Sequence, residues 1–447
     1  MNPKQDIRAI FAKAVERVDP RTMITQNMAL EENTLLIHCN ATTIKEDLTS
    51  YDRIFVLGIG KASSKMGRAI EDILGKRITA GKAVTKYGHS EKLDIITVTE
   101  AGHPIPDENS VRGAGELYEL AHTADEHTLI INLVSGGGSA LFCLPAEGVS
   151  LQDKQDMTRI LLECGANIKE INCIRKHISL VKGGHFARVS YPARMINIIL
   201  SDVIGDRLDT IASGITVADD TTFAQAQGII DKYHIHDRVP ASISALIRAG
   251  CAGKVPDTPK LGDRAFANIS NILLGNNAAA CRAARDYGAS LGYNACFLTS
   301  SLSGEASQIA RVFTAMAKDI DQSVSDLKRP ALIVAGGETT VTIRGSGKGG
   351  RNQEMALAFL IELMEDYNDF TGIHFLSGGT DGNDGPTDAA GAVVSLDTIK
   401  CIAETGIRPS VYLDNNDSYH FFEKTGGLVI TGPTNTNVCD IQLLIVE

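Results

Sequence analysis

The chain has 447 residues, with 43 lysines and arginines against 54 aspartates and glutamates, and so a formal net charge of −11. This acidic balance argues against nucleic-acid binding, which relies on basic surfaces that neutralise phosphates. No apolar run approaches the roughly 20 residues that span a bilayer, and the nine scattered cysteines form no C-x-x-C pair. We therefore expect no nucleic-acid or membrane partner, and a cytoplasmic, reducing location.

Short apolar runs alternate with amphipathic segments along most of the chain. Continuous apolar runs separated by helices are typical of parallel sheets that are covered on both faces. The sequence therefore predicts an α/β fold. Strands are expected at 53–58, 128–134, 195–200, 272–274, 331–335, 374–376 and 441–446, and helices at 7–18, 64–74, 241–249, 277–291 and 351–360.

The alternation breaks between residues 233 and 264, where prolines and charged turns surround one modest helix. We place the domain boundary there, which gives an amino-terminal α/β domain over residues 1–240 and a carboxyl-terminal α/β region over 241–447. A second candidate boundary lies at 326–330, where a polar helix ends and a strand begins.

Two glycine-rich loops directly follow predicted strands. In the first, glycines and a helix N-terminus suit an anion, and Lys61 adds a positive charge; it lacks the third glycine of a dinucleotide fingerprint and is no Walker A motif. In the second, three consecutive glycines favour a ligand wrapped by main-chain N–H groups. The alternative is that both loops are tight turns. The candidate binding residues are Gly58, Gly60, Ser63, Ser135, Gly136, Gly137, Gly138 and Ser139.

Further charged residues follow in the same half of the chain. If their segment is helical, Arg175, Ser179 and Lys182 lie on one face, where they suit a carboxylate or phosphate or simply face solvent. Asp202 follows the predicted strand 195–200, at the end where ligands bind in open α/β sheets. It suits a metal ion or a hydroxyl proton, or only caps a turn.

The densest cluster spans residues 336–354. Arg351 stands in the first turn of a predicted helix, where a cation is unfavourable unless it meets a bound anion. Glu338, Gly347, Gly349 and Gly350 are candidate binding residues beside it. Asp381 and Asp388, in the glycine loop 377–391, suit a hard divalent cation.

Several glycine loops, two isolated cations and clustered carboxylates are together typical of metal-assisted phosphoryl transfer. The motifs resemble those of the class II glycerate 2-kinase family, which joins an amino-terminal glycerate-kinase domain to a carboxyl-terminal MOFRL domain, here at about 330–447. The matches run in family order over about nine-tenths of the chain. They are GIGKAS at 58–63, SGGGSAL at 135–141, RKHISLVKGG at 175–184, SDVIGD at 201–206, ASGIT at 212–216, GGETTVTIRGSGKGGRNQE at 336–354, TDGNDGPTDAAG at 380–391 and TGPTNTNVCD at 431–440.

The resemblance implies ATP-dependent phosphorylation of D-glycerate to 2-phosphoglycerate, with Mg²⁺ or another divalent cation. It implies two Rossmann-like α/β domains with mostly parallel sheets and an active site in the interdomain cleft. By the same resemblance, Lys61 and Arg351 stabilise the transition state, and we expect them to converge on the transferred phosphoryl group. We assign Asp202 as base or metal ligand, and consider a homodimer.

Three other functions are compatible with parts of the pattern. A sugar-phosphate isomerase or binding module of the SIS type shares the strand, glycine turn and helix, but needs no cluster like that at 336–391. A hydroxypyruvate reductase would need the nicotinamide fingerprint that the first glycine loop lacks. A non-catalytic ligand sensor on the same fold would not need all the motifs.

Overall fold

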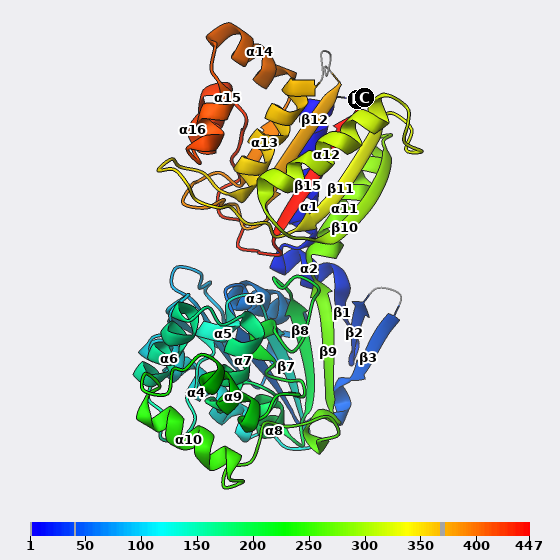
Figure 1. Cartoon of the computed structure of the whole chain (residues 1–447). Helices are drawn as coiled ribbons and strands as arrows, with labels where there is room; N and C mark the ends of the chain where they lie inside the picture. Colours follow the sequence, from blue (N-terminus) through cyan, green and yellow to red (C-terminus); the bar gives the residue numbers. More distant parts are fainter. Residues whose placement is uncertain (1, 40–41, 367–371) are drawn as a thin grey trace. The chain divides into compact units, whose positions relative to one another are not determined.

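The computed structural model describes residues 2–39, 42–366 and 372–447. Two compact units divide the chain, and each has its own sheet (Figure 1). One unit comprises Met23–Leu274, and the other combines Met1–Thr22 with Gly275–Glu447. Residues 241–274, which the sequence analysis placed with the carboxyl-terminal region, belong to the Met23–Leu274 unit, because their last strand joins its sheet.

The Met23–Leu274 unit is built on a six-stranded sheet in the order β6-β5-β4-β7-β8-β9. The strand pairs from β6 to β8 are all parallel. The carboxyl ends of β4, β7 and β8 therefore share one edge of the sheet. The strands are β4 (Arg53–Ile59), β5 (Ala80–Lys86), β6 (Ile96–Ala101), β7 (Thr128–Val134), β8 (Arg194–Leu200) and β9 (Ile269–Gly275).

Helices cover this sheet because its central strands are apolar throughout. The seven residues of β7 are all buried. A core cluster packs β4, β7 and β8 against α4 (Glu108–His122), α5 (Gly138–Leu141) and α8 (His185–Ser190), while α3 (Ser63–Leu74) contacts β4, β5 and β7. An antiparallel sheet adjoins, formed by β1 (Met28–Glu31), β2 (Thr34–Cys39) and β3 (Thr42–Asp47).

A separate helical cluster in the same unit has its own apolar core. It is formed by α6 (Leu151–Glu163), α7 (Ile168–His177), α9 (Phe223–Lys232) and α10 (Ala241–Cys251). Short 3₁₀ helices lie at Leu48–Ser50, Gly75–Arg77, Ile211–Ser213 and Arg264–Phe266.

The second unit has a mixed sheet in the order β10-β11-β15-β12-β13-β14. Among the strands described in this sheet, β10 and β11 pair in parallel, whereas the other neighbours are antiparallel and β15 lies between β11 and β12. The expectation of mostly parallel sheets is therefore met by the Met23–Leu274 unit and not here. The strands are β10 (Asn294–Leu302), β11 (Ala331–Gly337), β12 (Ile373–Gly379), β13 (Gly391–Val394), β14 (Leu428–Val429) and β15 (Asp440–Val446).

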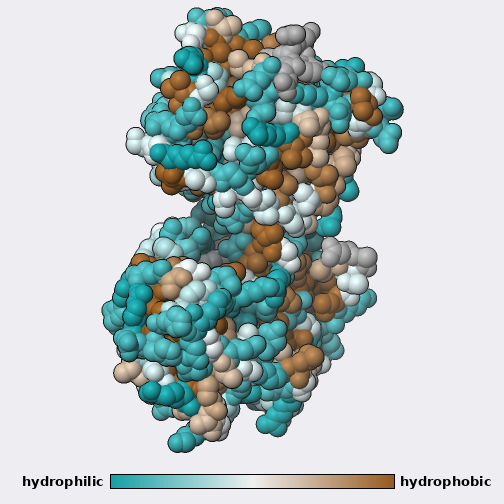
Figure 2. Space-filling view, in the orientation of Figure 1, coloured by the Kyte–Doolittle hydropathy of each residue, from teal (hydrophilic) through white to brown (hydrophobic). Residues whose placement is uncertain are grey.

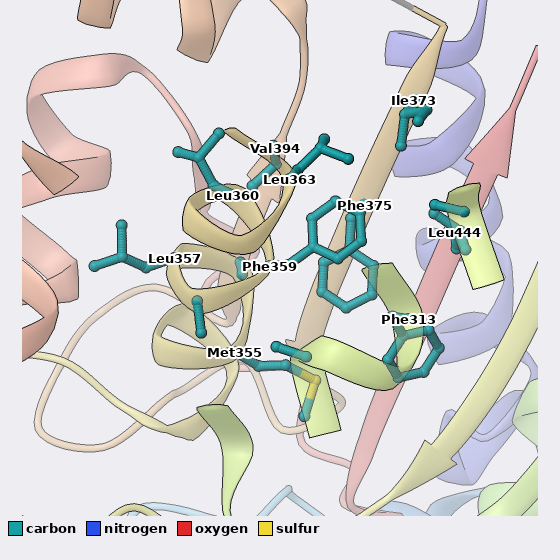
Figure 3. Close-up of a cluster of buried hydrophobic side chains, with 14 of the residues drawn as sticks. Phe313, Met355, Leu357, Phe359, Leu360, Leu363, Ile373, Phe375, Val394 and Leu444 are labelled. Atoms are coloured by element: carbon teal, nitrogen blue, oxygen red, sulfur yellow. The ribbon is translucent and has the colours of Figure 1, made fainter. Parts of the chain in front are cut away.

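Aliphatic and phenylalanine side chains form the core between this sheet and two helices (Figure 3). The Phe359 and Phe375 rings stack at 4.4 Å between centroids, and Phe313 lies 5.1 Å from Phe375. The helices are α12 (Ala306–Asp321) and α13 (Arg351–Asp366); α1 (Pro3–Arg17) and α11 (Asn277–Ser290) also contact the sheet. The remaining helices are α2 (Pro20–Asn27), α14 (Leu396–Thr405), α15 (Pro409–Asp414) and α16 (Ser418–Thr425).

The fold class is α/β, as the alternation of apolar runs predicts. The surface seen in Figure 2 is largely hydrophilic, with hydrophobic residues scattered between polar ones. This is expected because the apolar runs of the sequence are buried in the cores. No helix among the described residues is long and apolar enough to cross a membrane.

Candidate active site

The two glycine loops after β4 and β7 are hydrogen-bonded to each other. The backbone N–H of Lys61 donates to the Gly136 carbonyl at 2.9 Å, and that of Ser135 donates to Ile59 at 2.9 Å. The Ala62 N–H donates to Ser135 Oγ at 3.0 Å. Ser63 Oγ is also used internally, since it donates to the Val84 carbonyl at 2.9 Å. The loops thus form a rigid junction at the sheet edge.

Close approach of neighbouring groups explains the glycines in this junction. A Cβ at Gly60, whose φ is +113°, would lie 2.4 Å from the Ser135 carbonyl oxygen. A Cβ at Gly58 would lie 2.7 Å from Ala83 Cβ, and one at Gly138 would lie 2.9 Å from Ala212 Cβ. These three glycines therefore have a packing reason that needs no ligand.

Two other glycines of the junction bring charged groups together. A Cβ at Gly136 would meet Asp202 Oδ2 at 2.1 Å. A Cβ at Gly137, whose φ is +83°, would lie 3.2 Å from Lys61 Cε and 3.0 Å from His103 Cδ2. The predicted residues Lys61 and Asp202 thus lie around one short loop, together with His103, which the sequence analysis missed.

Burial and neighbouring charges shift the pKa values of Asp202 and His103. Burial raises the pKa of Asp202, and the nearby Lys61 charge opposes that rise. Burial, followed by repulsion from Lys61, Lys86 and His89, lowers the pKa of His103 to about 4. The His103 imidazole is therefore neutral at pH 7. Both groups can accept a proton when they are in their basic form.

A cavity of about 640 Å³ opens beside this loop. Its walls include the predicted residues Gly137, Ser139, Arg175 and Lys182. Ser139 Oγ also contacts Ser213 Oγ at 2.8 Å. The other lining residues are His103, Pro104, Ile105, Pro106, Ala140, Cys143, Gln152, Lys154, Gln155, Asp156, Thr158, Arg159, Leu162, Glu163 and Ile178.

Four cationic side chains line the cavity, and three of them, Lys154, Arg175 and Lys182, pair with no carboxylate among the described residues. Lys182 Nζ is buried and donates to the Ser139 carbonyl at 2.8 Å. Lys154 Nζ is buried without a hydrogen-bond partner in the described part of the chain, and its polar neighbour is the Cys143 thiol. Burial lowers the pKa of Lys154 and of Arg175, and, helped by repulsion from Lys154, lowers that of Lys182 to about 7.

The sequence analysis selected Arg175 and Lys182 as binding residues, but the single helical face on which it placed them is not formed. Helix α7 ends at His177, so Lys182 does not continue a helical face from Arg175. Ser179 instead donates to the Leu144 carbonyl at 3.0 Å. Lys154 was missed, although a signal existed: it shares the buried face of α6 with Met157 and Ile160, a position where an apolar residue is expected.

In the other unit, Arg351 stands at the first turn of α13, as predicted, but faces carboxylates. Its guanidinium donates to Asp440 at 2.6 and 2.9 Å, and its third nitrogen lies 3.1 Å from Glu338. Burial lowers the pKa of Arg351, but the bonds and charge of Asp440 and the Glu338 charge outweigh it and raise the pKa. A protein partner therefore already balances the cation at this helix N-terminus.

The direction of β15 explains this arrangement. Asp440 is the first residue of β15 and pairs in register with Gly337 of β11 and Gly379 of β12. Because β15 is antiparallel to both strands, its first residue lies at their carboxyl ends. A Cβ at Gly379 would lie 3.2 Å from Asp381 Oδ1 and 3.5 Å from Asp440 Oδ1, so two carboxylates flank that glycine.

The glycine loop before α13 is held by other loops of the same unit. The N–H groups of Gly347 and Lys348 donate to the Asn415 carbonyl and to Asp417, both at 2.9 Å. A Cβ at Gly347 would lie 2.4 Å from Asp417 Cβ, one at Gly349 would lie 2.2 Å from Ser418 Oγ, and one at Gly350 would lie 2.3 Å from Asp384 Cγ. Packing within the protein thus accounts for these glycines.

Asp384 caps α13 and was not among the predicted residues. Its carboxylate accepts from the N–H groups of Asn352 and Gln353 at 3.1 and 2.8 Å. Burial raises its pKa to about 6, against the lowering effect of those bonds. Its role in this structure is to stabilise the helix that carries Arg351.

The two predicted metal ligands are in different surroundings. Asp381 Oδ1 accepts from the Asn383 N–H at 3.1 Å, and exposed Asp388 accepts from the Tyr419 hydroxyl at 2.7 Å. Among the described residues, no group of three or more histidine, cysteine, aspartate or glutamate side chains is placed to hold a metal. The donor set therefore does not form an all-protein cage, although Mg²⁺ bound together with phosphates needs only one or two carboxylates.

Comparison with known proteins agrees with this architecture. Residues 6–248 match the family described as "Domain of unknown function (DUF4147)", and residues 331–440 match the MOFRL family. The chain is 43% identical to a D-glycerate 2-kinase of Thermotoga maritima, over 89% of this chain and 92% of that one. It is 41% identical to a glycerate 2-kinase of Pyrococcus horikoshii, over 99% and 98%.

A relative with another name and two crystal structures complete the comparison. A putative hydroxypyruvate reductase of Agrobacterium vitis is 36% identical, over 100% of this chain and 95% of that one. The structure of a Pyrococcus horikoshii protein matches with a TM-score of 0.90 at 39% identity, over 100% and 99% of the two chains. That of a Thermotoga maritima glycerate kinase matches with a TM-score of 0.88 at 39% identity, over 99% of each. The chain therefore belongs to the class II glycerate kinase family, in which a DUF4147 domain precedes a MOFRL domain, and it is a kinase.

Proposed function

We propose that the protein transfers the γ-phosphoryl group of ATP to the 2-hydroxyl of D-glycerate, giving 2-phosphoglycerate and ADP. The observation that carries this proposal is the grouping of Lys61, Asp202 and the Gly136–Gly137 peptide at the carboxyl ends of β4, β7 and β8. A cation beside a proton acceptor, next to a cation-lined cavity, suits attack of a hydroxyl on a phosphoryl group. The glycerate 2-kinase relatives support the substrate.

In the proposed reaction, the 2-hydroxyl oxygen of glycerate bonds to the γ-phosphorus. The hydroxyl proton passes to the Asp202 carboxylate, and the bond from the γ-phosphorus to its bridging oxygen breaks, leaving its electron pair on ADP. Lys61 would neutralise charge on the transferred group, and Arg351 is proposed as a second cation of the reaction. The Ser135–Ser139 loop, Arg175 and Lys182 would hold the anionic parts of the substrates.

A divalent cation would neutralise the phosphates when bound. Of the two predicted ligands, Asp381 is the better candidate, because its carboxylate lies beside Gly379 near Asp440, whereas Asp388 is bonded to Tyr419. Location in the cytoplasm and a homodimeric assembly stay predictions from the sequence.

A coupled assay tests the proposal. The protein is incubated with Mg-ATP and D-glycerate, ADP release is followed, and the product is offered to enolase with or without phosphoglycerate mutase. Product consumed by enolase alone is the expected result. A requirement for the mutase would overturn the 2-hydroxyl as the acceptor, and no glycerate-dependent ADP would overturn the substrate.

The competing function of hydroxypyruvate reductase makes a different prediction. It requires a nicotinamide cofactor, and the loop after β4 lacks the third glycine of the fingerprint that binds one. Oxidation of NADH or NADPH by hydroxypyruvate, in place of ADP release with glycerate, would favour it.

A further inference from the structure

The cavity beside Gly137 carries more positive charge than its own carboxylates balance. Lys154, Arg175 and Lys182 line it without a carboxylate partner among the described residues. Its two acidic residues, Asp156 and Glu163, are both held by Arg159, at 2.9 and 3.2 Å. Buried cations without counter-ions are costly, so the arrangement calls for a bound anion of more than one charge.

The size of the cavity also distinguishes between the two substrates of the proposed reaction. Its volume of about 640 Å³ lies within the range of roughly 300–1,000 Å³ that is typical of pockets for drug-sized ligands. A three-carbon hydroxy acid would leave most of this space to water. A nucleotide has the dimensions to fill it.

Apolar side chains line the same cavity where it opens to solvent. Ile105 and Leu162 both line it and are 68% and 62% exposed, so they lie towards its mouth. Gln155 of α6 donates to the Pro106 carbonyl at 2.7 Å, which ties the segment carrying Ile105 to the helix carrying Leu162. Apolar groups at the mouth and cations inside match a ligand with an aromatic base at one end and phosphates at the other.

We propose that this cavity binds the nucleoside triphosphate, with the phosphate chain on Lys154, Arg175 and Lys182 and the base between Ile105 and Leu162. The inference rests on the proposed function for its choice of a nucleotide, and it assigns that substrate to the Met23–Leu274 unit. It also adds Lys154 to the binding residues. Because a phosphate chain carries several negative charges and glycerate only one, the three cations match the former.

Direct binding measurements on the full-length protein test the assignment. Calorimetric titrations with Mg-ATP, Mg-tripolyphosphate and D-glycerate compare the unchanged protein with Lys154→Met and Leu162→Ala. We expect Lys154→Met to weaken ATP and tripolyphosphate at least about tenfold, and to leave D-glycerate within about twofold. Leu162→Ala should weaken ATP about threefold and leave tripolyphosphate unchanged. Exposed Lys169→Met and Leu261→Ala, which do not line the cavity, are the matched controls.

The outcomes separate this inference from the proposed function. Unchanged ATP affinity in Lys154→Met, or an equal loss for ATP and D-glycerate, would overturn the nucleotide assignment. Should Lys154→Met not fold, Lys154→Arg keeps the charge and is expected to bind ATP within about threefold; a tenfold loss there, with folding intact, would also overturn it. If the protein does not phosphorylate D-glycerate, the proposed function fails, while the ATP and tripolyphosphate titrations still decide what the cavity binds.

Discussion

The cavity in the Met23–Leu274 unit and the start of α13 in the other unit differ in how the charge of their cationic side chains is balanced. In the cavity, the described carboxylates leave Lys154, Arg175 and Lys182 without an ion-pair partner. At α13, Asp440 and Glu338 balance Arg351. The first arrangement is costly in the absence of an anion, whereas the second is complete without one. The comparison teaches that cationic side chains without carboxylate partners indicate a site for an anion, whereas Arg351, the proposed second cation of the reaction, is already held by carboxylates of the protein.

The same contrast occurs within one segment of the Met23–Leu274 unit. Lys176 and Lys182 are both buried, but Lys176 Nζ pairs with buried Asp219 at 3.0 Å. Lys182 has no such carboxylate partner among the described residues, and burial lowers its pKa to about 7. The presence of a partner, rather than burial alone, therefore separates the two roles.

The largest expected effect is a loss of stability when Arg351, the cation paired with Asp440 and Glu338, is replaced. Arg351→Met leaves the fully buried Asp440 carboxylate unpaired, which costs about 3–5 kcal/mol in comparable sites, and we expect the lower end because Arg351 itself is 33% exposed. Urea unfolding of the purified variant measures the loss. The double variant Arg351→Met/Asp440→Asn should recover most of the stability and none of the activity. Equal stability of Arg351→Met and the unchanged protein would contradict the comparison.

The next effect concerns catalysis alone. Lys61→Ala should lower kcat by about 10²–10³, corresponding to the 2.7–4 kcal/mol typical of one lost charge-stabilising contact, with little change in stability. Steady-state kinetics with thermal unfolding measure both, and exposed Lys76→Ala is the control. A kcat within about threefold of the unchanged protein would remove Lys61 from the proposed mechanism.

A smaller effect is expected for Asp381, the carboxylate that flanks Gly379 together with Asp440. Asp381→Asn should raise the Mg²⁺ concentration needed for half-maximal activity about tenfold, because a ligand charge is lost. Activity titrated with Mg²⁺ measures this shift, and Asp388→Asn, whose carboxylate is bonded to Tyr419, is the comparison. An unchanged Mg²⁺ dependence in Asp381→Asn would exclude it as a metal ligand.

The smallest predicted effect is a gain in stability, and it is expected when Lys154 is replaced by methionine. Because burial lowers the pKa of Lys154, the folded protein at neutral pH carries a cost that the unfolded chain, with an ordinary lysine, does not. Lys154→Met should therefore raise the melting temperature by about 2–4 °C while nucleotide affinity falls. A lower melting temperature would mean that Lys154 has a stabilising partner.

Sequence reasoning predicted the α/β class and the elements that carry the site, because apolar periodicity and glycine clusters are local signals. It selected Lys61 and Asp202 as candidates from their positions after strands; the structure places both at one sheet edge, and their roles stay predictions. It could not foresee that Asp440 would meet Arg351, because that contact depends on the antiparallel direction of β15. It interpreted Gly347, Gly349 and Gly350 as a ligand loop. It could not foresee the packing around these glycines, because the side chains that crowd them come from residues distant in sequence.

The central claim is that the cationic side chains of the cavity bind the phosphates of the nucleotide. The number of protons taken up when the nucleotide binds tests this claim most directly. Burial, with repulsion from Lys154 and Arg175, lowers the pKa of Lys182 to about 7, although the nearby Cys143 acts to raise it. At about pH 8 Lys182 is therefore mostly neutral, while the phosphates of ATP are ionised. A phosphate beside Nζ would raise that pKa, so binding should take up a proton. Calorimetry in two buffers of different ionisation enthalpy should detect a net uptake that falls in Lys182→Met. No uptake, or a release of protons, would contradict the account.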